Sequence, residues 1–78
     1  QPAQGGLQYA MELPAPGTYQ IQCFDSSGAL LLDETRPSSF NGPTCGTIDL
    51  KGWSSGLYYM TISQGIHHES TRILVVSE

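Results

Sequence analysis

Positive charge is scarce in this sequence. Of 78 residues only three are Lys or Arg, against seven acidic residues, and the formal net charge is −4. Proteins that follow a nucleic-acid backbone need clustered Lys and Arg, so the composition argues against nucleic-acid binding. The same shortage argues against attraction to an anionic membrane surface. We therefore expect no nucleic-acid partner and no direct membrane insertion.

Long apolar runs are also missing. No segment approaches the roughly 20 apolar residues of a membrane-spanning helix. The chain begins at Gln1 and lacks the basic start and apolar block of a secretion leader. We expect a single domain over residues 1–78, excised from a longer protein whose own targeting signal lies elsewhere.

Cysteine is limited to Cys23 and Cys45. The two could form one disulfide, which requires Cα atoms within about 7 Å, or they could be a core thiol and a loop thiol. Cys23 continues the apolar alternation of Tyr19 and Ile21, and a free Cys packs like a small apolar side chain. This pattern favours a buried Cys23 thiol and leaves the disulfide open.

Uninterrupted stretches suited to a helix are lacking. Nine Gly and five Pro are spread along the chain, and the longest interval without either is Ile66–Glu78. A helix needs about ten or more uninterrupted residues with a period of 3.6, whereas apolar residues here recur with period two. We therefore expect essentially no helix.

Alternating apolar and polar residues predict strands instead. Asp25-Ser26-Ser27-Gly28 and Ser63-Gln64-Gly65 are turn sequences that predict two antiparallel hairpins. Pro14 and Pro16 fit a crossing between sheets, because Pro donates no ladder hydrogen bond. The result is a small antiparallel immunoglobulin-like (Greek-key) β-sandwich of six to seven strands. The six expected strands cover residues 7–13, 18–25, 29–35, 47–50, 57–63 and 66–76.

Residues 36–46 form the longest segment that does not fit a strand pattern. Their composition, R-P-S-S-F-N-G-P-T-C-G, indicates a surface loop that connects two sheets, and Phe40 is expected to fold back over an edge of the core. Loops of this length often carry function. This one lacks convergent acids, bases or nucleophiles, so the connecting role is favoured.

Residues that could carry catalysis or bind a metal do not converge. His67-His68-Glu69 resembles a ligand set, but neighbours on a strand point to opposite faces, so only His67 and Glu69 share one. Zinc sites use three or four ligands. No Ser lies in a nucleophile-elbow context, and no glycine-rich phosphate loop precedes a helix. We expect no catalytic, cofactor-binding or metal-binding residues and no enzyme activity.

Residues 48–62 contain a sharp corner, Gly52-Trp53-Ser54-Ser55-Gly56, between two strand patterns. Trp53 could be an exposed aromatic that stacks on a sugar or a partner, or it could plug the end of the sandwich. Its spacing from Leu50 and its small neighbours favour the plug. Tyr58 is expected to send its hydroxyl back to the upstream backbone, as in a tyrosine corner.

Four short motifs, taken in order, resemble a known family. They are Asp25 and Gly28 in a D-x-x-G turn; Ile48, Asp49 and Leu50; Gly56, Leu57 and Tyr58; and Arg72 followed by Ile73–Val76. Their order resembles the type A C-terminal sorting domain of the type IX secretion system (the Por system) of Bacteroidetes, over residues 19–76. Departures from the family pattern are Pro2-Ala3 at the start, Trp53-Ser54 at the corner and Ser77-Glu78 at the end.

The resemblance implies a sorting address. Such domains are recognised at the outer membrane by the type IX translocon and its shuttle, and in many cargoes a sortase then removes them. It implies transit through the periplasm, followed by surface attachment or secretion. It also implies structural roles for Asp25, Gly28, Asp49, Leu50, Gly56, Leu57 and Tyr58. The expected recognised residues are Arg72, Ile73, Leu74, Val75, Val76, Ser77 and Glu78.

A different class of function fits the same fold. A plain immunoglobulin- or fibronectin-like module would act as a spacer, or would bind a carbohydrate or protein through Trp53 or residues 36–46, since fold does not determine function. Exposed strand edges in so small a sandwich also allow a strand-swapped or edge-paired homodimer.

Overall fold

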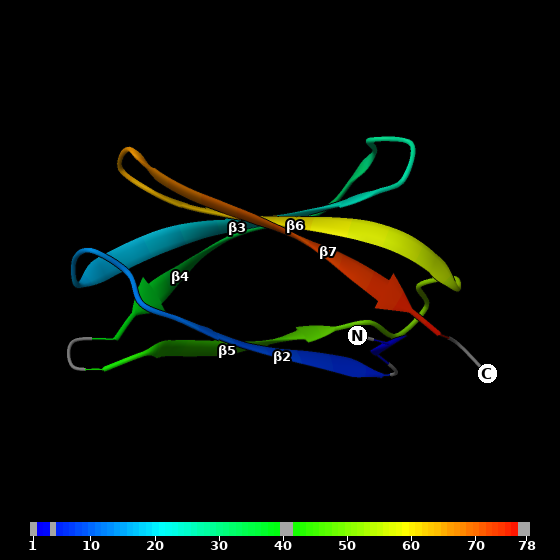
Figure 1. Ribbon diagram of the computed structural model, residues 1–78, viewed down its shortest axis with the longest axis horizontal. Helices are drawn as coiled ribbons and strands as arrows, with labels where there is room; N and C mark the ends of the chain where they lie inside the picture. Colours follow the sequence, from blue (N-terminus) through cyan, green and yellow to red (C-terminus); the bar gives the residue numbers. More distant parts are fainter. Residues whose placement is uncertain (1, 4, 40–41, 77–78) are drawn as a thin grey trace.

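The computed structural model describes residues 2–3, 5–39 and 42–76. Over these ranges the chain forms strands in two layers and contains no helix, so none could cross a bilayer (Figure 1). The predicted all-β sandwich is confirmed. Its strands are β1 (Pro2–Ala3), β2 (Gly6–Met11), β3 (Gly17–Asp25), β4 (Leu30–Ser38), β5 (Thr44–Asp49), β6 (Gly56–Gln64) and β7 (His67–Val75).

The two layers differ in size. The larger sheet has the order β1-β7-β6-β3-β4, whereas the smaller sheet consists of β2 and β5 (Figure 1). The β3–β4 and β6–β7 hairpins pair through β3 and β6, and β1 runs parallel to β7. The chain changes sheet after β1, after β2, after β4 and after β5, which gives the non-sequential neighbours of a Greek-key sandwich. The predicted crossings at the Pro-rich joint and at the Trp53 corner are confirmed.

The core comes from alternate residues of the facing strands. Leu7, Tyr9 and Met11 of β2 and Trp53 of the corner pack against it while partly buried. These side chains lie on the inward faces that period-two alternation predicts. The fully enclosed side chains, each at most 7% exposed, are Tyr19, Ile21, Cys23, Ile48, Leu50, Tyr58, Met60, Ile62, Ile73 and Val75.

The β3–β4 turn forms as its sequence predicts. The Gly28 N–H donates to the Asp25 carbonyl at 3.0 Å, and Gly28 has a φ of 93°, which suits a residue without Cβ. Asp25 Oδ1 accepts hydrogen bonds from the hydroxyl and N–H of Ser27 and from the N–H of Ala29. These bonds, led by the one from the Ser27 hydroxyl, lower the pKa of the Asp25 carboxyl.

The prediction of a loop over residues 36–46 is wrong. β4 continues to Ser38 and β5 begins at Thr44, so the connection between the sheets is short. Pro37 lies within β4, which forms one edge of the larger sheet. An edge strand tolerates Pro because its outward N–H has no ladder partner to lose. Phe40, expected to cover the core, lies outside the described residues.

The corner at Trp53 has the two features expected of it, a Trp53 side chain packed on the core and a Tyr58 hydroxyl bonded to upstream backbone. The Trp53 N–H donates to the Leu50 carbonyl at 3.0 Å, which closes the turn. The Trp53 and Tyr58 rings lie 4.9 Å apart between centroids at 32°, with Trp53 packed on the core. The Tyr58 hydroxyl donates to the Ser54 carbonyl at 2.7 Å. The plug role of Trp53 and the backbone hydrogen bond of Tyr58 are therefore confirmed.

Replacing Tyr58 with Phe should lower the free energy of unfolding by about 1 kcal/mol, because the hydrogen bond to Ser54 is lost while the ring packing stays. Urea denaturation followed by fluorescence measures the change. Tyr59→Phe is the matched control, since Tyr59 lies on the outer face at 39% exposure and should change stability by less than about 0.5 kcal/mol. Equal effects of the two substitutions would contradict the assignment.

Candidate functional site

A polar network joins the two sheets along β4. Arg36 Nη1 donates to Tyr9 Oη at 2.9 Å and to the Thr47 carbonyl at 3.0 Å, and the guanidinium pairs with Glu34 at 2.7 Å. The hydroxyls of Tyr9 and Tyr19 lie 2.6 Å apart. Burial, followed by the hydrogen bond to Tyr9, raises the pKa of Tyr19 to about 12, so this phenol stays protonated at physiological pH. The network is a structural bridge, with no activated nucleophile.

Sequence patterns did not reveal this network. The composition of residues 36–46 predicts a loop for Arg36, whereas it lies on β4 and reaches across to the smaller sheet. The signal that could have found it is the spacing of Glu34 and Arg36, because residues two apart on a strand share a face and can pair. The hydrogen bond between Arg36 and Tyr9 could not be predicted from a local sequence pattern, because the two residues are 27 positions apart.

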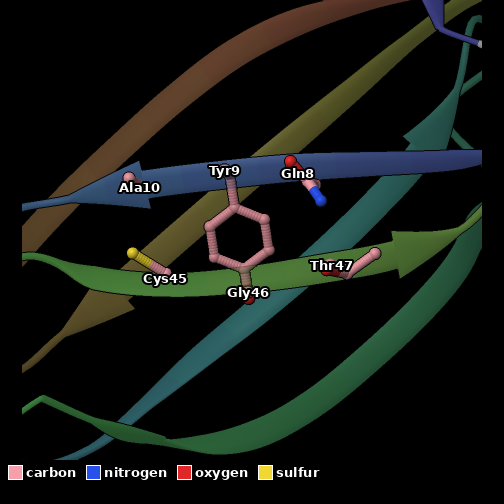
Figure 2. Close-up of a pocket in the computed structure, with 6 residues that line it drawn as sticks. All are labelled: Gln8, Tyr9, Ala10, Cys45, Gly46 and Thr47. Atoms are coloured by element: carbon pink, nitrogen blue, oxygen red, sulfur yellow. The ribbon is translucent and has the colours of Figure 1, made fainter.

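Tyr9 lies across Gly46 of the smaller sheet. The two residues are directly paired between β2 and β5, and Figure 2 shows the Tyr9 ring extending from β2 to Gly46. A Cβ atom at Gly46 would collide with the hydroxyl and Cζ of Tyr9. Around this pair lies a shallow hollow lined by Gln8, Tyr9, Ala10, Cys45, Gly46 and Thr47 (Figure 2). Its lining contains no carboxylate or imidazole that could activate Cys45.

Both cysteines are free thiols. Cys23 is fully buried and Cys45 is exposed, which confirms the buried-thiol interpretation over the disulfide. Burial raises the pKa of the Cys23 thiol to about 11. A protonated, enclosed thiol is a poor nucleophile.

The His67 and Glu69 side chains share a face, as alternation predicts. His67 Nε2 lies 2.7 Å from Glu69 Oε2. Over residues 2–3, 5–39 and 42–76 no group of three or more His, Cys, Asp or Glu side chains is placed to hold a metal ion. The pair is a surface contact on β7.

The residues expected to be recognised, 72–78, include a buried set and an exposed set. Ile73 and Val75 of β7 are 3% and 2% exposed and belong to the core. Arg72, Leu74 and Val76 point to the other side and are exposed, with Leu74 at 44% and Val76 at 37%. Strand alternation accounts for this division. The remaining two expected residues, Ser77 and Glu78, lie outside the described part of the chain.

The exposed residues of β7 continue onto β6. Arg72 lies beside Tyr59 and Leu74 beside Leu57; Tyr59 is 39% exposed and Leu57 is 37% exposed. We call Leu57, Tyr59, Arg72, Leu74 and Val76 the outer-face patch. Arg72 makes no ion pair with any residue that the structure describes. Exposed apolar groups gathered in this way are typical of interaction surfaces.

The last strand does not form a fully open edge. β1 lies alongside its end, with Pro2 beside Leu74 and Ala3 beside Val75. In the described chain, His67–Ile73 have no strand partner on that side. The expected exposed edge is therefore limited to the first part of β7.

The residues expected to have structural roles lie in turns, in the core and at a strand start. Asp49 Oδ1 accepts the Lys51 N–H at 2.9 Å before the corner, and Leu50 is 3% exposed. Gly56 and Leu57 open β6, where Leu57 joins the outer-face patch. Their contribution to sorting stays a prediction.

The sequence comparisons place the chain in a family. The secretion system C-terminal sorting domain family matches residues 1–77. The chain therefore belongs to this family, the C-terminal sorting signal of the type IX secretion system. Membership implies recognition by the type IX machinery and export to the cell surface or secretion, and the family is a sorting signal rather than a catalytic domain. No curated protein and no solved structure gave a match.

Gly46→Ala should destabilise the domain by about 1–3 kcal/mol, because the added methyl group displaces Tyr9 from its place across β5. The free energy of unfolding measures the effect. Gly6→Ala is the control on the partner strand, where the nearest atom to an added Cβ lies at 3.7 Å. A Gly46→Ala domain as stable as Gly6→Ala would contradict the close packing of Tyr9.

Stability should fall as the pH rises from 9 toward 11. The Cys23 thiol has a pKa of about 11 in the folded chain against an ordinary value of 9.0, so the unfolded state loses its proton first. The loss approaches about 1.4 kcal/mol per pH unit at most. Cys23→Ala should make the fall of the unfolding free energy between pH 9 and pH 11 less steep, and Cys45→Ala should not. An unchanged slope in Cys23→Ala would refute this.

Proposed function

We propose that the type IX machinery recognises this domain through the outer-face patch. The proposal rests on the alternation along residues 72–76: Ile73 and Val75 are buried, while Arg72, Leu74 and Val76 are exposed. A partner can touch the exposed set without unfolding the sandwich. The buried set acts indirectly by holding the strand on the core. Ser77 and Glu78 extend the proposed surface.

The chemistry of the patch suits a protein partner. Arg and Tyr are enriched among residues that dominate binding energy, and Arg72 lies beside Tyr59 at one end of the patch. The guanidinium of Arg72, which pairs with no carboxylate of residues 2–3, 5–39 or 42–76, offers a fork of donors to a carboxylate or to backbone carbonyls. Leu57 and Leu74, directly paired on neighbouring strands, supply apolar surface on one side of it. In a chain of net charge −4, Arg72 favours an acidic contact on the partner.

The proposed partners are the outer-membrane translocon, its shuttle and the sortase. The proposed route leads through the periplasm to the cell surface or the medium. One continuous core that both sheets share supports the proposal that residues 1–78 act as a single domain. A rigid domain presents the outer-face patch without an ordering cost on binding.

The family motif residues have a supporting role in this proposal. Asp25 and Gly28 hold the β3–β4 turn, and Asp49 and Leu50 lead into the corner that Tyr58 fastens. Gly56 begins β6, the strand that lies directly beside β7. Changes at these positions should reduce sorting through lost stability.

Self-association through strand edges, paired or swapped, stays a proposal for this chain. The outer edge of β4 could serve pairing, but Asp33, Glu34 and Pro37 on that strand oppose it. Sedimentation of the isolated domain measures its oligomeric state.

An export assay tests the outer-face patch. A reporter joined to the N-terminus of residues 1–78 is expressed in a host with a working type IX system, and its periplasmic and exported fractions are measured. Arg72→Ala and Leu74→Ala should each reduce the exported fraction by about tenfold, the equivalent of about 1.4 kcal/mol of recognition energy. His68→Ala is the control, since His68 is exposed on the same strand beside Ser63, away from the patch.

The outcomes separate two claims. A wild-type reporter that stays in the periplasm overturns the sorting function. Wild-type export with equal export of Arg72→Ala and Leu74→Ala overturns the outer-face patch alone. Thermal melting of each variant shows whether a loss of export comes from unfolding.

A further inference from the structure

β2 forms one of the two edges of the smaller sheet. The Leu50 N–H donates to the Gly5 carbonyl at 2.7 Å, next to the Gly6–Asp49 pair. Bonded and non-bonded pairs alternate along an antiparallel ladder. The backbone N–H and C=O groups of Gln8 and Ala10 therefore point away from β5. Within the described ranges no strand pairs with this side of β2.

The other strand edges are blunted or covered over part of their length. By the same alternation the Thr47 carbonyl points outward from β5, and Arg36 caps it at 3.0 Å. The β4 edge contains charged residues and Pro37, and β1 covers the end of β7. Natural sheets blunt their edges with such features. β2, with the sequence G-L-Q-Y-A-M, contains neither a charge nor a Pro.

A groove runs beside this open edge because β7 extends beyond β2. On the core-facing side of β7, Ile73 and Val75 are buried, whereas Glu69 and Thr71 on the same side are exposed. The smaller sheet lacks a strand that would cover them. The resulting cavity of about 280 Å³, here the β2 groove, is lined by Tyr9, Ala10, Met11, Met60, Ile62, Glu69, Ser70 and Thr71.

We propose that the β2 groove binds one extended peptide segment of a partner protein by strand addition. The segment pairs its backbone with Gln8 and Ala10, which extends the smaller sheet beneath β7. Its alternate apolar side chains enter the cavity beside Met11 and Thr71, which line it. A Lys or Arg of the segment reaches the Glu69 carboxylate, whose side chain is 49% exposed.

The space beside β2 is wide enough for one peptide strand but not for a second folded copy of the domain. Paired strands lie about 4.8 Å apart, and β2 of two copies would have to approach to that distance. Each copy carries a β7 that projects beyond its own β2, so the two projections would occupy the same space. A single peptide strand carries no second sheet, so it fits beneath the β7 of one copy. The β2 groove opens on the face of β7 opposite the outer-face patch, so it does not rest on the recognition surface proposed above.

A defined peptide tests the proposal. The probe is the heptapeptide Lys-Thr-Val-Thr-Val-Thr-Val with blocked ends, which places Lys and three Val side chains on one face. Titration into ¹⁵N-labelled protein should shift the amide signals of Gln8 and Ala10. The same peptide N-methylated at alternate residues, so that it cannot donate to β2, should bind at least tenfold more weakly.

Two variants locate the contact. Ala10→Pro removes an N–H that points away from β5, so the β2–β5 ladder keeps its hydrogen bonds and peptide binding should be lost. Thermal melting confirms that this variant is folded. Glu69→Gln should weaken the Lys peptide several-fold and leave a peptide with Thr in place of Lys unchanged.

Several outcomes would overturn the proposal. These are equal binding of the N-methylated and unmodified peptides, signal shifts confined to the outer-face patch, or no binding at millimolar peptide. A wild-type dimer that Ala10→Pro converts to a monomer would assign the edge to a second copy instead. None of these outcomes depends on export, so they are distinguishable from failure of the outer-face patch.

Discussion

Two strands must cover a sheet of five, and this mismatch governs the rest of the molecule. The smaller sheet shields the middle of the larger one, so the side chains that are less than 2% exposed belong to β3 and to β5: Ile21, Cys23 and Ile48. At the β4 side, Arg36 reaches across the gap and satisfies both the Tyr9 hydroxyl and an outward carbonyl of β5. At the β7 side nothing comparable is present in the described chain, and Glu69 and Thr71 face solvent from a core-facing position.

Much of the fold could be predicted from the sequence because strand alternation is a local property. The spacing of Tyr19, Ile21 and Cys23 is enough to predict that their side chains share one face of a strand. The D-x-x-G turn likewise predicts the hairpin that it closes. Residues 36–46 were misassigned because Pro37 and the small polar residues around it are also compatible with an edge strand, and edge position is set by the whole sheet. β1 was not predicted, since its pairing with β7 joins residues more than seventy positions apart.

The candidate site was less predictable than the fold. The motif that carries the family resemblance coincides mostly with turns and core, where Tyr58 and Leu50 act on stability. Which residues of the last strand are exposed follows from alternation only once Ile73 and Val75 are known to face the core. The lateral neighbours of Arg72 on β6 depend on the pairing register, which no single strand encodes. Family membership thus identifies the role of the domain, whereas the outer-face patch is a proposal for the surface that performs it.

The parallel pairing of β1 with the end of β7 has a mechanical consequence. Pro2 and Ala3 run in the same direction as Leu74 and Val75 beside them. Tension that draws the two ends of the chain apart therefore acts along both strands in opposite directions. In this shear geometry the hydrogen bonds of the pair are strained together, rather than opened one after another as at the end of a hairpin. A domain that is pulled at both ends during export would meet its first resistance at this short parallel contact.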